Sequence, residues 1–296
     1  MRSRRTTQSR SPGRTRFTSL RLFIFLGSFF LATASGQEKS QASDFSSTRL
    51  LKIAEKEQAI YEKAAEDPDY RNNRDLERRI NEVARDYRSY LADNPEDVDA
   101  LILYGKLLRR LGEKEQAFNI FLKADALDPR LAVVKQQIGA YLAEQGKGKA
   151  ALTFYLNAVE LEPETPAYAF GLGQLIFKFR ERFIEENIYS RESLDREMMK
   201  AFRSAAELAP DNFNFQMRLG EAYYDLKEPD WTEALQHWEN LREQQADTPL
   251  RKSIIDLHRA RVLIELERFA EAGELARSVD QPALQATRRE ILDQLP

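Results

Sequence analysis

Two consecutive stretches decide the fold: residues 98–129, VDALILYGKLLRRLGEKEQAFNIFLKADALDP, and residues 132–163, AVVKQQIGAYLAEQGKGKAALTFYLNAVELEP. When they are aligned on their Leu-Tyr-Gly and Gln-Ile-Gly segments, glycine, alanine, aromatic and proline positions coincide. A fixed period of about 34 residues is typical of helical repeat arrays, so the sequence predicts stacked helices. The coinciding residues are Gly105 with Gly139, Ala117 with Ala151, Phe121 with Tyr155, Ala124 with Ala158, and Pro129 with Pro163.

Each stretch reads as two helices joined by a glycine turn. The second helix is expected to end before Pro129 or Pro163, because proline cannot continue a helix. A glycine inside a helix costs roughly 0.5–1 kcal/mol relative to alanine, so its recurrence at one phase needs a packing reason. We expect small residues to let the paired helices touch and aromatic residues to fill the gap between units. Gly146 and Gly148 fall at the turn, and we expect Gly148→Leu to be mild compared with Gly139→Leu.

These residues resemble the tetratricopeptide repeat family, whose helix–turn–helix unit carries a Leu-Gly pair, a small Ala, an aromatic residue, a second Ala and a terminal Pro. The match is close in two units and weaker in those that follow. The resemblance implies an all-α fold, a right-handed superhelical solenoid of antiparallel helix hairpins. The Leu-Gly pair returns at Gly173 and Gly220, and Ala260 takes its place in a fifth unit.

The domain organisation follows from these landmarks. An atypical N-terminal hairpin is expected over 48–95 and the array over 96–296, with an insertion at about 180–192 that lengthens the third unit. The units are expected at about 98–131, 132–165, 166–212, 213–248 and 253–280, followed by a capping helix at 284–295.

The first 36 residues have the order of a secretory signal peptide: seven arginines, an apolar run at 22–31 and a small-residue stretch. The run is about half the ~20 residues that a membrane helix needs. We therefore expect cleavage after Ala34 or Gly36, a linker at 37–47, and an exported chain, periplasmic or secreted, with a bacterial envelope favoured and no membrane span after cleavage.

Charge and cysteine content exclude several classes of function. Seven of the 45 basic residues lie in 1–36, which holds no acids, so residues 37–296 carry 38 basic against 48 acidic side chains. This balance disfavours nucleic acid as a partner. The chain has no cysteine and only His237 and His258, so thiol chemistry and multi-histidine metal sites are not expected. Both histidines are interpreted as helix residues, His237 near Glu233, and the sequence predicts no catalytic residue, no metal and no cofactor.

The stacked units leave a binding surface as the expected functional feature. In the family that the repeats resemble, the first helix of each unit lines a concave groove. Whether Phe170 and Phe177 lie in this groove or in the hairpin core stays open, and groove placement would let them anchor a peptide. The positions that match the groove are Ile102, Lys106, Arg109, Gln136, Phe170, Gln174, Phe177, Met217, Glu221 and Tyr224.

Two functions from different classes remain. The favoured one is a non-enzymatic adaptor or scaffold that binds a peptide segment of a protein partner. The alternative is a structural protein that associates with itself through its terminal units or the insertion, giving a homo-oligomer. An enzyme would require an acid/base pair in the groove, for which Glu221 and Asp225 are the candidates.

Overall fold

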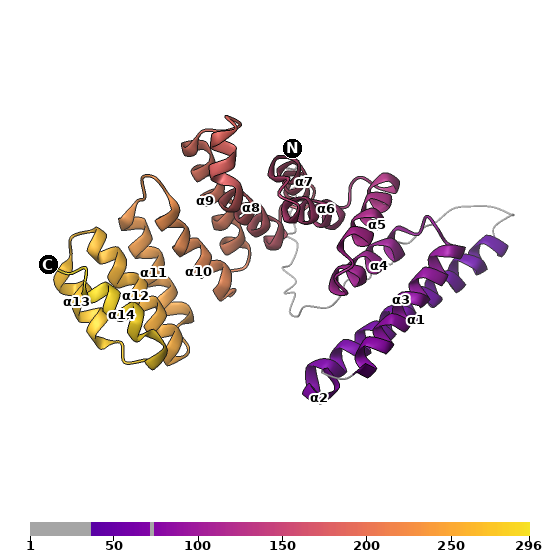
Figure 1. Cartoon of the computed structure of the whole chain (residues 1–296), viewed down its shortest axis with the longest axis horizontal. Helices are drawn as coiled ribbons and strands as arrows, with labels where there is room; N and C mark the ends of the chain where they lie inside the picture. The colour runs from indigo at the N-terminus through magenta and orange to yellow at the C-terminus, as the bar shows by residue number, and fades with distance from the viewer. Residues whose placement is uncertain (1–36, 72–73) are drawn as a thin grey trace, which may run out of the picture. The chain divides into compact units, whose positions relative to one another are not determined.

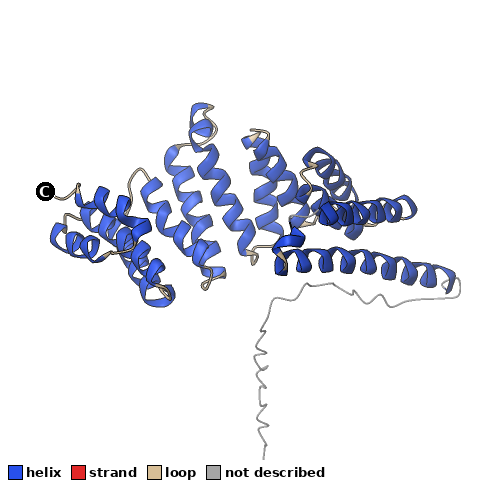
Figure 2. Ribbon diagram, turned by 60° about the horizontal axis from the view of Figure 1, so that its bottom comes forward, coloured by secondary structure: helices blue, strands red, loops and turns tan. Residues whose placement is uncertain are grey.

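The computed structural model describes residues 37–71 and 74–296, and every element of regular structure within these ranges is helical (Figures 1 and 2). Residues 46–296 form one compact unit, whose packing is described below. The expected signal peptide lies outside the described residues.

The first helices are α1 (Gln37–Glu66), the short α2 (Pro68–Arg71) and α3 (Arg74–Asp93). The hairpins that follow are α4 (Val98–Arg110) with α5 (Lys114–Leu127), α6 (Ala132–Glu144) with α7 (Gly148–Leu161), and α8 (Pro166–Glu185) with α9 (Arg191–Leu208). The chain continues through α10 (Phe213–Ala222), the 3₁₀ turn η1 (Tyr223–Asp225), α11 (Trp231–Gln245), α12 (Pro249–Glu265), α13 (Phe269–Ser278), η2 (Pro282–Leu284) and α14 (Gln285–Leu292).

Consecutive helices pack side by side throughout the array. The two helices of each hairpin contact one another, and each second helix also contacts the first helix of the next hairpin, as α5 does α6 and α7 does α8. The buried apolar side chains form one cluster that runs from Ile53 to Ile291. The expected all-α solenoid of antiparallel hairpins is therefore confirmed.

Local sequence sets where the helices start and stop. Asp97 accepts a hydrogen bond from the backbone N–H of Ala100 and so caps α4, as Asn212 and Asp230 cap α10 and α11. The turns of the first two hairpins use Gly112 (φ +81°) and Gly146 (φ +73°), a left-handed conformation that favours glycine.

The repeating glycines of the first helices provide room for aromatic rings. A Cβ added to Gly105 would lie 2.8 Å from the ring of Phe121, and one added to Gly173 would lie 2.7 Å from that of Phe202. Gly139 faces Tyr155 and Gly220 faces Trp238 in the same way. Each ring therefore fills a notch in its own hairpin. Tyr155 also lies against Gly171 of α8, and Trp238 stacks on His258 of α12, so these two rings fill the gap between units as expected.

The repeating alanines of the second helices lie in the core. All four have no exposed surface, so the expectation that small residues let paired helices touch is confirmed for them. They are Ala117 and Ala124 in α5, and Ala151 and Ala158 in α7. The helices that carry them end at Leu127 and Leu161, before the prolines of the repeat, as expected.

The surroundings of Gly148 contradict the expectation that a substitution there is mild. This glycine is buried at the start of α7, and a Cβ there would meet the ring of Phe179 in α8 at 2.5 Å. The turn conformation expected for Gly146 and Gly148 together belongs to Gly146 alone. Gly148 instead lets the next hairpin approach closely.

The third hairpin is longer than its neighbours. Helix α8 has 20 residues where α6 has 13, and α9 has 18 where α7 has 14. The extra length extends both helices around the expected insertion at 180–192. Residues 37–47 are helical as part of α1, and the final helix spans Gln285–Leu292 after η2, within the expected 284–295.

We expect Gly139→Leu to destabilise the array by roughly 1–3 kcal/mol, because its Cβ would lie 2.9 Å from the buried ring of Tyr155. Gly148→Ala should also lower the melting temperature, since Phe179 must move. Thermal unfolding followed by circular dichroism measures both changes. Ala270→Leu, at an exposed position of α13, is the control. A melting temperature for Gly139→Leu equal to that of the control would contradict the interlocked packing.

Candidate functional site

The residues expected to line a groove lie on the first helices α4, α6, α8 and α10, with Tyr224 in η1. They differ in exposure. Ile102 is a core residue, only 8% exposed, so its expected place on a binding surface is wrong. Met217 and Tyr224 are half-buried and pack against the core, and Tyr224 also meets His258 of the hairpin that follows. We call the surface formed by the remaining residues the first-helix face.

At the N-terminal end of this face the charged groups have partners within the chain. Arg109 forms an ion pair of 2.8 Å with Glu144. Burial, followed by repulsion from Arg110, lowers the pKa of Lys106, while attraction to Glu57 opposes the shift. Gln136 is half-buried and its side-chain oxygen accepts a hydrogen bond from Gln137. These contacts leave few polar groups at this end of the face free to bind a ligand.

Phe177 and Phe170 have different surroundings. Phe177 is 39% exposed, and the guanidinium of Arg218 stacks 4.6 Å from its ring centre. Phe170 lies with its ring 4.6 Å from Phe215 and 5.8 Å from Phe202. Phe177 is therefore at the surface, whereas Phe170 is half-buried between rings of α9 and α10.

Arg218 holds the exposed ring from beneath. Its side chain is only 11% exposed, lies 4.4 Å from the ring of Phe202, and forms a 2.9 Å ion pair with Asp225. Sequence reasoning did not identify Arg218, since an arginine in an amphipathic helix is normally read as a solvated residue. Its burial between two aromatic rings depends on how α8, α9 and α10 meet.

Two charged residues of opposite sign belong to the same part of the face. Burial raises the pKa of Glu221, against the attraction of Arg218. Arg261 of α12 is exposed, with its guanidinium 4.7 Å from the ring of Tyr224. Gln174, half-buried, lies one turn before Phe177 in α8. We define the Phe177 cluster as Phe177, Arg218, Glu221 and Arg261.

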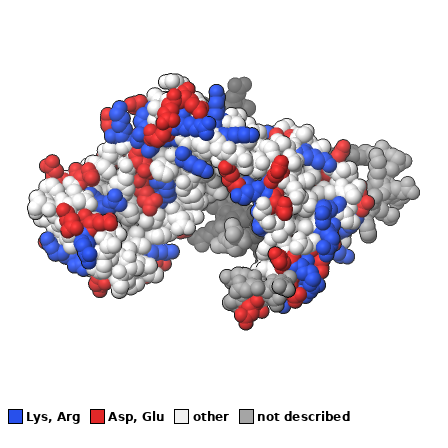
Figure 3. Space-filling model, viewed as in Figure 1, with Lys and Arg blue, Asp and Glu red and all other residues white. Residues whose placement is uncertain are grey.

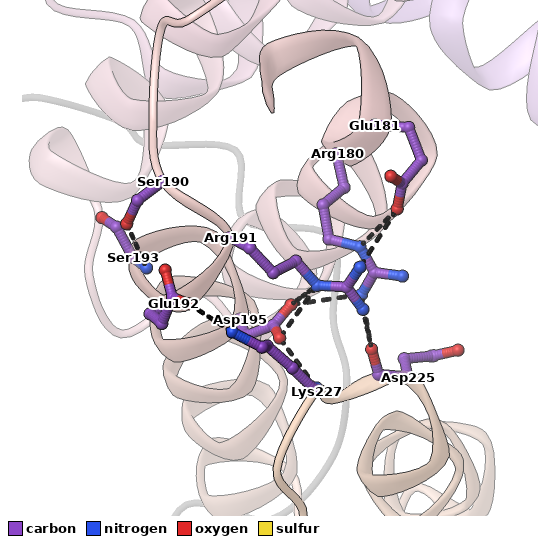
Figure 4. A network of polar contacts seen from close by, with 9 residues as sticks. All are labelled: Arg180, Glu181, Ser190, Arg191, Glu192, Ser193, Asp195, Asp225 and Lys227. Atoms are coloured by element: carbon purple, nitrogen blue, oxygen red, sulfur yellow. Dashed lines mark hydrogen bonds and ion pairs between the residues drawn. The ribbon is translucent and has the colours of Figure 1, made fainter. Parts of the chain in front are cut away.

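A polar network on the extended hairpin fixes the turn that carries Asp225 (Figure 4). Arg180 and Arg191 both donate to the backbone carbonyl of Asp225, at 2.7 and 2.9 Å. Asp195, buried, accepts from both arginines and, at 3.0 Å, from the backbone N–H of Lys227. The extra residues of the third hairpin thus clamp the irregular turn of the fourth.

The two histidines are packed rather than presented to solvent. His237 contacts the carbonyl of Gln216 through Nε2 at 2.8 Å, and Glu233, which lies near it as expected, forms its ion pair with Arg203. His258 stacks on Trp238, with ring centres 4.2 Å apart, and its Nδ1 lies 3.3 Å from the hydroxyl of Tyr224. Within the described residues no cluster of histidines and carboxylates could hold a metal ion.

Stability should fall on mild acidification because of His258. Burial, assisted by Arg261, lowers the pKa of His258 to about 4. The unfolded histidine titrates near ~6.5, so between these values the unfolded state binds more protons and stability is lost as pH falls. We expect a loss of about 1–2 kcal/mol between pH 7 and 5, measured by chemical denaturation.

His258→Gln should flatten this dependence. The pKa of His237 is also lowered by burial, so His237→Gln is the matched comparison. Equal pH dependence in the wild type and His258→Gln would show that His258 does not titrate as its surroundings imply.

Surface charge and cavities complete the description of the site. On the face shown in Figure 3, basic and acidic side chains are intermixed rather than gathered into a single-sign field. One hollow of about 660 Å³ is lined by residues 208–214 and Arg251, and another of about 500 Å³ lies between the start of α7 and the end of α8. In the part of the chain that the structure describes, no helix has both the length and the apolarity to span a bilayer.

Comparison with known proteins agrees with this architecture. Residues 78–132 match the tetratricopeptide repeat family model. Human tetratricopeptide repeat protein 7A is 30% identical over 93 residues, which are 31% of this chain but only 11% of that protein. The chain thus spans about a tenth of the length of this relative.

Solved structures resemble the array at low identity. YrrB, described as a TPR protein with an unusual peptide-binding site, has a TM-score of 0.53 and 17% identity, with 70% of this chain and 92% of that chain covered. MamA from Desulfovibrio magneticus RS-1 has a TM-score of 0.47 and 18% identity, with coverage of 67% and 98%.

Proposed function

We propose that this chain, a tetratricopeptide-repeat protein, is a non-enzymatic adaptor that binds a peptide segment of a protein partner on its first-helix face. The observation that carries the proposal is the exposure of Phe177 on a fixed support. An aromatic ring that is 39% exposed and backed by a buried arginine is a rigid apolar contact surface. Rigid aromatic anchors are characteristic of the residues that dominate protein interfaces.

The surroundings of Phe177 indicate the chemistry of the segment. Arg218 and Arg180 both lie against the ring, 4.6 and 5.7 Å from its centre, and pair with Asp225 and Asp195. The exposed part of the ring therefore offers apolar contact without an unpaired charge beside it. Glu221 and Arg261 supply one charge of each sign on the neighbouring helices. We therefore expect a peptide with one apolar anchor residue flanked by charged or polar residues, bound by shape and a single anchor.

The non-enzymatic part of the proposal rests on how the titratable groups are used. Glu221, the candidate acid, has its carboxyl beside Arg218 and Arg261, and Asp225 is paired with Arg218. His237 and His258 pack against aromatic rings and backbone. These groups support the packing of the hairpins, and the hydroxyl that His258 contacts, that of Tyr224, is itself half-buried between rings.

Replacement of Phe177 by aspartate tests the proposed surface. We expect Phe177→Asp to abolish capture of the native partner in affinity purification from the source organism, because a carboxylate cannot replace the apolar anchor. Tyr189→Asp, an equally exposed aromatic residue in the turn between α8 and α9, is the control and should retain the partner. Both variants must melt at the wild-type temperature.

Loss of the partner with Tyr189→Asp alone would assign binding to the extended hairpin and contradict the proposal. Capture unaffected by either variant would also contradict it. Tyr224→Asp is a poor probe, since Tyr224 packs between Trp231 and His258.

We further propose that the adaptor works outside the cytoplasm, after removal of residues 1–36. The support is the order of arginines, apolar run and small residues in the sequence. Mass spectrometry of the protein purified from its host should give a chain that starts at Ser35 or Gln37. A mass that includes Met1 or the apolar run would contradict export by cleavage.

A further inference from the structure

The outer side of α7 carries an exposed ridge with an unusual order of side chains. Lys149, Thr153, Leu156 and Glu160 are all exposed and follow one another at intervals of four, three and four residues. This spacing places them in one row along the helix. Leu156, at the middle of the row, is 46% exposed, more than any other large apolar side chain of the described residues.

Exposed leucines gather on this part of the array. Four of the eight exposed large apolar side chains lie on α5 and α7, as Leu122, Leu127, Leu156 and Leu161. The first two precede the second two by one full repeat. The series ends at α9, where the position equivalent to Leu156 is Arg203, which pairs with Glu233. The apolar surface is therefore confined to two successive hairpins.

The charges at the two ends of the ridge are available to a second molecule. Neither Lys149 nor Glu160 forms an ion pair with another described residue. The first turn of α7 contains no acid and its N-cap residue, Lys147, provides no side-chain cap, so this helix end favours an incoming carboxylate. The other end of the ridge supplies such a carboxylate, Glu160.

The ridge is complementary to itself. A two-fold axis midway between Thr153 and Leu156 relates residue 149 to residue 160 and residue 153 to residue 156. Two-fold interfaces pair the same residues reciprocally, so two antiparallel α7 helices would join each Lys149 to a Glu160 and set each Leu156 beside a Thr153. Antiparallel pairing thus satisfies both charges twice and covers both leucines.

The hollow at the start of α7 matches the same arrangement. Its volume is about 500 Å³, and its lining includes Lys149, Thr153, Arg182 and Phe183. In antiparallel register this hollow lies opposite the C-terminal end of the other α7, which carries Glu160 and the exposed Leu161. Arg182 in this lining is paired with Glu186, so Lys149 is the basic group that suits the Glu160 carboxylate of the second copy.

We propose that the outer face of α7 is a homodimer interface, in which α7 packs antiparallel against α7 of a second copy of this chain. A helix of 14 residues is about 21 Å long, so the contact lies at the small end of specific interfaces and the dimer should dissociate on dilution. This face is distinct from the Phe177 cluster, and the proposal does not depend on peptide binding there.

Reversing the charge of Lys149 or of Glu160, which the two-fold axis would bring together, tests the proposal. The protein is purified from its host and its association is measured by sedimentation equilibrium over about 1–500 µM. We expect a reversible dimer for the wild type. Lys149→Glu would place two carboxylates opposite each other and Glu160→Lys two ammonium groups, and each should weaken dimerisation at least tenfold, or about 1.4 kcal/mol.

The decisive sample is an equimolar mixture of these two variants. In a heterodimer of Lys149→Glu with Glu160→Lys, every position 149 again faces the opposite charge, so the mixture should dimerise where each variant alone does not. Lys252→Glu makes the same charge change at an exposed site of α12 and should leave dimerisation unchanged.

Three results would overturn the proposal. A wild-type protein that stays monomeric over the whole range would exclude the interface and leave the exposed leucines to a different partner. Dimerisation that survives both single variants would place the contact elsewhere. Failure of the mixture to recover, with both variants melting as the wild type does, would contradict the antiparallel register.

Discussion

The array depends on one steric constraint: the first helix of a hairpin must lack a side chain where the second helix places a ring. Four hairpins meet it with a glycine opposite an aromatic residue, from Gly105 with Phe121 to Gly220 with Trp238. The fifth meets it differently, with Ala260 in the first helix and the small, fully buried Ala276 in the second. Complementary volume, rather than glycine itself, is what the fold requires.

The extended third hairpin modifies this plan locally. The fourth hairpin breaks its first helix at η1 and would leave backbone groups of the turn without partners. Arg180, Arg191 and Asp195 provide these partners from α8 and α9. Removing one member of such a buried ion pair typically costs ~3–5 kcal/mol, so the extension and the irregular turn are interdependent. Asp225, held by this network, in turn fixes Arg218 beneath Phe177.

Much of the fold was predictable, because a repeat sets the side of the helix on which many residues lie at once. The helix pairs, the glycine turn at Gly146 and the lengthened third hairpin follow from spacing alone. The role of Gly148 did not, because its neighbour Phe179 belongs to the lengthened part of α8, outside the repeat pattern. Likewise, helical phase placed Ile102 and Phe177 on the same face, but exposure differs because adjoining helices cover one and not the other.

The stacking of the hairpins therefore produces two separate surfaces, one on the first helices and one on the second helix α7. First helices bring Phe177, Glu221 and Arg261 of separate hairpins together, whereas a second helix, α7, carries an exposed row of its own. Because these faces use different residues, dimerisation through α7 would leave each Phe177 cluster free. A dimer then presents two equal binding sites, and a partner with two copies of the peptide would bind the second site at an effective concentration set by the spacing of the sites. Weak, anchor-based recognition at one site is compatible with firm attachment to a multivalent partner.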